Sequence, residues 1–200
     1  MINAFISGFG LSLSLILAIG AQNAFVLKQG LKNERVFLVC AICALSDAIL
    51  IFSGVAGMGY LIERFPAFAS LARWGGFAFL LAYGARSLWS ALRDSHAMKP
   101  ADAPRASVQK TLALTLAFTW LNPHVYLDTL VLVGAVAGKY APLHWIFGAG
   151  AAGASFAFFF SLGYGAKALA PAFARPLTWK IFEGLVGVVM IILAFAILPK

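Results

Sequence analysis

Two acidic residues lie inside apolar stretches of this chain, where a carboxylate is costly and is usually kept for function. Asp47 lies near the centre of residues 36–62, and Asp128 lies within residues 111–137. Each could bind a cation, carry a proton or pair with a buried base. The middle of each apolar stretch contains no Lys or Arg to serve as that base. A protonated or solute-bound acid is therefore expected.

Amide side chains and helix breakers accompany these acids. Gly20-Ala21-Gln22-Asn23 ends the first apolar stretch, and Asn122-Pro123 lies six residues before Asp128. Glycine loosens a helix, whereas proline removes a backbone donor and clashes with the carbonyl four residues earlier. A broken helix exposes a half-helix N-terminus, and amides can replace water around a solute. Because the two motifs match between the halves of the chain, we interpret them as a transport site; packed kinks are the alternative.

Three further positions are candidates for a proton relay, a hinge or an ion pair. His124 and Asp128 are four residues apart, so a helix would place them on one face, where they could relay a proton or form a fixed hydrogen bond. Gly163 is a candidate hinge near the end of the fifth stretch. Glu183 follows Lys180 by three residues, which favours an ion pair at the membrane interface.

The composition excludes an ordinary soluble domain. The chain is 62% hydrophobic and 11% charged, whereas soluble domains contain roughly 25% charged residues. In a soluble protein, a net charge of +8 would suggest binding to nucleic acid. Here the basic residues gather in short loops between apolar segments, which indicates a lipid bilayer as the partner instead of nucleic acid. We therefore expect an all-α integral membrane protein with about six transmembrane helices. Their segments are 4–27, 36–62, 66–92, 111–137, 142–168 and 179–198.

The segments form two halves of one transmembrane domain, residues 1–200. The halves span about 1–92 and 111–198, joined by a polar linker at about 93–110. At an offset of 99 residues, several Leu and Ala positions match, and Asn23 matches Asn122. Three segments per half is an odd number, so a duplicated half would be inverted, as in many transporters. The sequence predicts two inverted three-helix repeats, with helices 1 and 4 broken at the polar motifs.

Basic residues also predict the orientation. Most Lys and Arg residues lie in the loops after the first, third and fifth segments. This bias places the linker in the cytoplasm and, with six full spans, both termini outside. Six short helices leave little room for a wide central site, so a homodimer is also considered.

The sequence gives no indication of an enzyme or a cofactor. GxSxG, Walker-type and HExxH motifs are absent, so transport would use an ion gradient or the gradient of the solute. Cys40 and Cys43 form a single CxxC pair, which we interpret as small hydrophobic residues. No resident metal is expected. Two Asp and one His could nevertheless bind a divalent ion as cargo, so a divalent or heavy-metal cation exporter is the alternative function.

The chain resembles the LysE/ArgO family of basic amino acid exporters, in the LysE/RhtB superfamily. The resemblance is carried by residues 19–30 around GAQN, by Ser46-Asp47-Ala48, by residues 121–129 (LNPHVYLDT) and by residues 162–166 (LGYGA). Length and segment number also fit, so it covers the whole chain. The homoserine/threonine branch carries Pro-Gly-Pro where GAQN stands here. The resemblance implies export of L-arginine or L-lysine across the bacterial inner membrane, coupled to a proton or another ion.

A basic amino acid would match the polar residues described above. It carries an α-ammonium group, a carboxylate and a distal cation. One of Asp47 and Asp128 would bind the side-chain cation, and the other would exchange protons. A half-helix N-terminus near Asn23 or Asn122 would receive the carboxylate. A membrane scaffold whose polar residues only join helices is a third interpretation.

Overall fold

The computed structural model describes residues 1–17, 20–58, 66–93, 106–169, 171, 173, 176–196 and 198. Secondary structure in these ranges is helical, in agreement with the all-α prediction. In chain order the helices are α1 (Ile2–Ile16), α2 (Ala21–Leu31), α3 (Val36–Ser53), the π-helix η1 (Gly54–Met58), α5 (Pro66–Arg93), α6 (Val108–Trp120), α7 (Pro123–Tyr126), the π-helix η2 (Leu127–Val133), α8 (Gly134–Gly138), α9 (His144–Leu169) and α10 (Pro176–Ala196).

Several helices are long and apolar enough to cross a membrane. Within the described ranges they are Val36–Gly57, His144–Leu169 and Leu177–Ala196, and the bent pair α1–α2 is a fourth if it forms one span. The third and fourth predicted segments do not pass this test. α5 contains Arg73 and Arg86, and the fourth segment is divided into pieces that are each too short.

The first apolar segment is broken near Gly20, as the sequence predicted. α1 and α2 meet at an angle of 84°. Gly20 is extended, with φ −111° and ψ 175°, directly before the first residue of α2. Asn23 donates a hydrogen bond from Nδ2 to the carbonyl of Ile16 over 2.7 Å. This bond satisfies one of the carbonyls that are left free where α1 ends.

The fourth segment is broken at Asn122-Pro123, but not by a proline kink inside a helix. Asn122 is the N-cap of α7, and its Oδ1 accepts a hydrogen bond from the His124 amide at 3.1 Å. Pro123 occupies the first helical position, where a missing N–H costs nothing. The Tyr126 hydroxyl donates to the carbonyl of Trp120 over 2.6 Å. Asn122-Pro123 therefore starts a new helix, and Tyr126 caps the old one.

Glycines allow the helices to cross at backbone contact. A Cβ at Gly150 in α9 would overlap the carbonyl of Phe5 in α1. A Cβ at Gly54 in η1 would lie 2.5 Å from the carbonyl oxygen of Leu130 in η2. Real Cβ atoms do not approach that closely, so both crossings require glycine. Small residues at such positions are typical of helix packing in membranes.

α5 and α10 form a pair that packs mainly against itself. A Cβ at Gly187 in α10 would lie 2.7 Å from Cγ of Leu88 in α5 and 3.0 Å from the carbonyl oxygen of Gly84. Contacts of this pair with α2, α6 and α7 are far fewer, whereas α9 packs extensively on α1, α2 and α3. The described helices thus divide into an α5–α10 pair and a larger group around α9.

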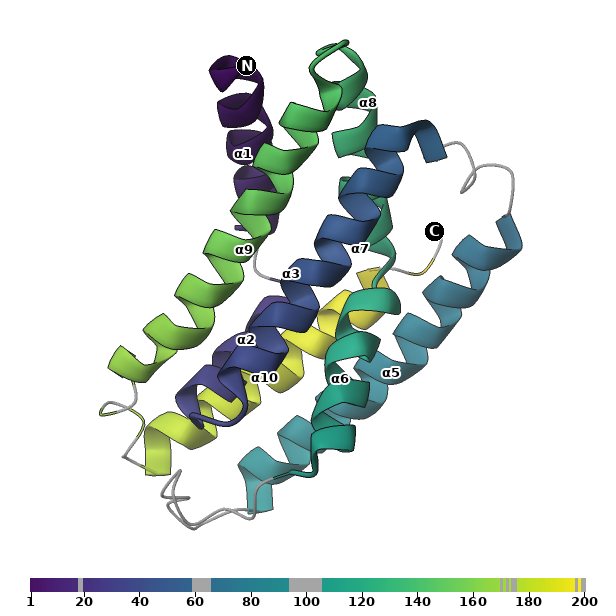
Figure 1. Cartoon of the computed structure of the whole chain (residues 1–200). Helices are drawn as coiled ribbons and strands as arrows, with labels where there is room; N and C mark the ends of the chain where they lie inside the picture. The colour runs from purple at the N-terminus through teal and green to yellow at the C-terminus, as the bar shows by residue number, and fades with distance from the viewer. Residues whose placement is uncertain are drawn as a thin grey trace.

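Basic side chains gather at one end of the bundle, which we call the basic end. Figure 1 shows the ends of α2, α5 and α9 and the starts of α3, α6 and α10 at this end, opposite the N-terminus. The described basic residues of these turns are Lys28, Lys32, Arg35, Lys110, Lys167 and Lys180. The basic loops that the sequence placed on one side of the membrane therefore lie at one end of the folded bundle.

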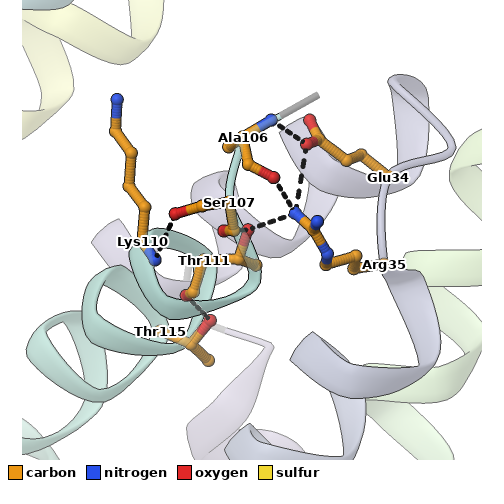
Figure 2. A network of polar contacts seen from close by, with 7 residues as sticks. All are labelled: Glu34, Arg35, Ala106, Ser107, Lys110, Thr111 and Thr115. Atoms are coloured by element: carbon orange, nitrogen blue, oxygen red, sulfur yellow. Dashed lines mark hydrogen bonds and ion pairs between the residues drawn. The ribbon is translucent and has the colours of Figure 1, made fainter. Parts of the chain in front are cut away.

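A polar network fastens the α2–α3 turn to the start of α6 (Figure 2). Glu34 Oε1 accepts a hydrogen bond from the Ala106 amide at 2.6 Å. Arg35 donates to the carbonyl of Ala106 and to Thr111 Oγ1, the latter at 3.2 Å. Arg35 has a φ of 48°, the left-handed conformation, which a non-glycine residue adopts only at a cost. The network holds this residue in place and joins the two halves of the chain.

Candidate functional site

A cavity of about 310 Å³ lies where both broken helices meet. Its size falls within the roughly 300–1,000 Å³ of small-molecule sites. Residues from α1, α2, α3, α5, α7, η2, α9 and α10 line it. Its polar residues are Ser12, Gln22, Asn23, Asp47, Asn122, His124, Asp128 and Thr129. The structure therefore brings together both predicted acids and both predicted amide motifs.

Asp47 lines this cavity and has one carboxylate oxygen without a hydrogen-bond partner among the described residues. The residue is 3% exposed, in the middle of α3. Its Oδ2 accepts a hydrogen bond from Ser155 of α9 at 3.0 Å. Its Oδ1 is buried and has no partner within the described part of the chain. A buried acceptor without a partner is costly, so a cationic or proton-donating ligand would satisfy it.

Gln22 supplies the complementary group, an amide donor. It is 6% exposed in the first turn of α2, and its side chain lies next to the Cys43 thiol. The N-cap of α2 is Gly20, which supplies no side chain to bond the first amides. The N-terminus of a helix carries partial positive charge and unsatisfied N–H groups, which favour an anion. The cavity therefore has an acidic wall and a separate wall of donors.

Asp128 and His124 line the cavity from the other broken segment. Asp128 is the second residue of η2 and is partly exposed, and His124 lies one turn earlier in α7 and is exposed. π-Helical turns within α-helices often occur at functional sites. Here the wider turn follows directly on the new helix that Asn122 begins. His124 and Asp128 lie one turn apart, which is compatible with the predicted position of both residues on one face. A proton relay between them stays a prediction.

Two predicted site residues lie outside the cavity lining. Pro123 acts on the backbone as the first residue of α7. Gly163 lies within the continuous helix α9, where a Cβ would contact Cys40 Sγ and where α2 approaches at Gly30. No helix break occurs at Gly163 in this conformation, and its role as a hinge stays a prediction. Cys40 and Cys43 are both free and buried.

Four aromatic side chains pack together one turn of α2 beyond Gln22, toward the basic end. Phe25, Phe79, Tyr83 and Phe118 form an aromatic layer, in which Phe118 lies 4.7 to 4.8 Å from three other ring centres. Phe25 and Phe118 are each 1% exposed. The layer follows Gln22 by one turn of α2.

An ion pair lies beyond the aromatic layer, and its partners differ from those predicted. Glu183 of α10 pairs with Lys28 of α2, not with Lys180. Lys28 Nζ lies 2.7 Å from Oε1 and 2.8 Å from Oε2 of Glu183. The two residues are 155 positions apart in sequence, so only the fold could bring them together.

Hydroxyl residues also belong to the site, although their sequence positions did not predict it. Ser12 of α1 and Thr129 of η2 line the cavity, and Ser155 holds Asp47. Ser12 and Ser155 are 3% and 0% exposed in otherwise apolar helices. In the sequence, the signal was a serine within an apolar stretch at each position. Within the described ranges, no group of three or more His, Cys, Asp or Glu residues could hold a metal ion.

Comparison with known proteins identifies the family. The family described as "LysE type translocator" matches residues 13–200. The chain belongs to the LysE family. A relative in Mycobacterium tuberculosis, "Putative amino-acid transporter Rv0488", is 44% identical over 186 residues, covering 93% of this chain and 92% of the relative. "Arginine exporter protein ArgO" of Salmonella paratyphi A is 41% identical over 197 residues, covering 98% and 93%.

The LysE match agrees with the family suggested by the sequence motifs. "Arginine exporter protein ArgO" of Salmonella enteritidis PT4 is also 41% identical over 197 residues. No solved structure matches this chain. Together with its apolar helices, membership of the LysE family makes this protein a multi-pass membrane transporter rather than an enzyme.

Proposed function

We propose that this LysE-family protein exports basic L-amino acids, arginine or lysine, from the cytoplasm. The observation that carries the proposal is the cavity between the two broken helices, which combines Asp47 and Asp128 with the Gln22 amide and the start of α2. The likeness to ArgO proteins over almost the whole of both chains supports arginine as the first substrate to test.

Each group of a basic amino acid has a suitable partner in this site. The free Oδ1 of Asp47 would accept a hydrogen bond from one cation of the substrate. The Gln22 amide and the first amides of α2 would hold the carboxylate. Asp128, with His124 beside it, would face the second cation or exchange a proton with the coupling ion. The carboxylates and the donors lie on different helices, so they could bind opposite ends of one solute.

We also propose that the chain consists of two inverted repeats with six spans. Helix packing supports this architecture because each half places its second helix on the broken helix of the other half. α9 packs on α1 and α2, and α3 packs on α6, η2 and α8. The second helices of the two halves, α3 and α9, also pack on each other, as do the third helices, α5 and α10. Gly150 and Gly54 mark the corresponding crossings. Such symmetry is common in secondary transporters.

The basic end would face the cytoplasm of a bacterial inner membrane. Lys and Arg accumulate on the cytoplasmic side of membrane proteins, and Figure 1 places the N-terminus at the opposite end. Six full spans would then leave both termini outside. Accessibility of single cysteines added at residues 1 and 198 to a membrane-impermeant thiol reagent tests this orientation. Labelling of neither position in intact cells would refute it.

The function is tested by efflux. Cells that lack other exporters, with and without this protein, are loaded with Arg- or Lys-containing dipeptides, and free amino acids in the medium are followed. Faster release of either amino acid, dependent on Asp47 and Asp128, would support the proposal. No difference for any amino acid, with the protein present in the membrane, would contradict it.

Stabilisation by divalent metals but not by arginine would instead favour the metal exporter. Collapse of the proton gradient in the same cells tests the coupling ion.

A further inference from the structure

Along α2, the ion pair between Lys28 and Glu183 lies between the basic end and the residues of α2 that line the cavity. Gln22 lines the cavity, Phe25 belongs to the aromatic layer, and Lys28 follows on the same helix. Six residues separate Gln22 from Lys28, about 9 Å along a helix. A solute that moves along α2 from the basic end therefore meets the ion pair first, then the aromatic layer, then the cavity.

The partner of Glu183 has the same chemistry as the proposed substrate. Glu183 is 4% exposed, so its carboxylate depends on a cation inside the protein. Lys28 supplies that cation at hydrogen-bond distance from both oxygens. The Tyr83 ring centre lies 5.4 Å from Lys28 Nζ, within the range of a cation–π interaction. A carboxylate and an aromatic face together would recognise a lysine or arginine side chain equally well.

Among the residues that the structure describes, positive charge exceeds negative charge around this carboxylate. Burial, and then repulsion from Lys28, lower the pKa of Lys32, whose Nζ lies 5.5 Å from the Trp179 ring centre. The other acid described at this end, Glu34, is engaged with Arg35 and the Ala106 amide. Glu183 is thus a single buried carboxylate for which several cations are available.

We infer that the Lys28–Glu183 ion pair is an inner gate that the substrate opens by competing with Lys28 for Glu183. This inference rests on the proposed function. Exchange of one cation for another leaves Glu183 paired throughout, which avoids an unpaired buried charge. Lys28 lies in the last turn of α2 next to the basic end, so its ammonium group can move to water when it is displaced. Glu183 would then select for a distal cation before the solute reaches Asp47.

Two neutralising variants test the gate. Lys28→Met removes the tethered competitor and leaves Glu183 available, so the KM for arginine efflux should fall at least threefold. The double variant K28M/E183Q leaves no charge unpaired and preserves the packing, so it should fold. Without Glu183, its initial arginine efflux should fall at least tenfold, with an unchanged melting temperature. Lys180→Met is the matched control because it removes a cation one turn from Glu183 on the same helix, and its efflux should stay within twofold of wild type.

The outcomes separate this inference from the proposed function. Wild-type efflux by K28M/E183Q would show that the ion pair only joins α2 to α10 and would overturn the inference. An unchanged KM in K28M would overturn it as well. If K28M alone does not accumulate in the membrane, the double variant decides. If the wild-type protein releases neither arginine nor lysine, the proposed function fails instead.

Discussion

Replacement of Asp47 by Asn is the sharpest test of the cavity. Asn has nearly the same shape and can still accept the hydrogen bond from Ser155, which the structure places at 3.0 Å from Oδ2. Packing and folding should therefore be preserved. What is lost is the negative charge at the free Oδ1, in a residue that is 3% exposed and so poorly screened by water. The variant isolates the charge from the shape.

The expected loss follows from the bond that the substrate would make. A hydrogen bond to a charged group contributes about 1.5–3 kcal/mol, and the burial of Asp47 favours the upper part of that range. A loss of about 2–3 kcal/mol corresponds to roughly a 30- to 150-fold decrease in kcat/KM for arginine. Efflux would be measured in proteoliposomes at several internal arginine concentrations, with equal amounts of protein inserted.

A control variant distinguishes the site from a general charge effect. Glu34→Gln also replaces a carboxylate by an amide, but Glu34 lies in the α2–α3 turn, away from the cavity. Its amide oxygen can still accept from Ala106, so efflux should remain within twofold of wild type. An Asp47→Asn protein that transports arginine with an unchanged kcat/KM would refute the assignment of this carboxylate to the substrate or to its coupling proton.

Three further predictions follow from the backbone and the turns. Asn122→Ala removes the N-cap of α7 and should lower the free energy of unfolding by about 1 kcal/mol, measurable as a lower melting temperature in detergent; an unchanged value would contradict the cap. Gly150→Val forces a side chain onto the Phe5 carbonyl and should destabilise the protein by about 1–3 kcal/mol, whereas Gly10→Val, where nothing is close, should not. Arg35→Ala removes the bonds to Ala106 and Thr111 and should speed amide exchange at residues 106–111; exchange at the wild-type rate would show that the network does not hold α6.

Local signals in the sequence predicted the helix breaks and the polar site. Gly20 and Asn122-Pro123 act on their own backbone, so their effect needs no knowledge of the fold. Asp47 and Asp128 stand out because a carboxylate in an apolar segment has few explanations. The mechanism at Asn122-Pro123 was nevertheless wrong in detail, because proline at the first position of a helix starts that helix instead of kinking it.

Pairings between distant helices could not be predicted. Lys180 was the nearest cation to Glu183 in sequence, but α2 packs beside α10 and supplies Lys28. Ser155 likewise reaches Asp47 across 108 positions. Such contacts depend on how helices are arranged in space, and apolar periodicity is weak in helices that face lipid on one side and protein on the other. Hydropathy alone also gave no sign that the fourth segment is divided into several short helices, and the number of spans stays a prediction.

The pairing of α5 with α10 has a consequence for movement. The cavity is lined on one side by Leu80 and Leu193 of this pair and on the other by residues of α1, α2, α3, α7, η2 and α9. The Lys28–Glu183 bond also crosses the same boundary. A rotation of α5 and α10 together would keep the packing between these two helices. It would move Phe79 and Tyr83 of α5 relative to Phe25 and Phe118 in the aromatic layer. The boundary between this pair and the other described helices thus contains the cavity, the aromatic layer and the ion pair, so a single rigid-body displacement of the pair would change all three together.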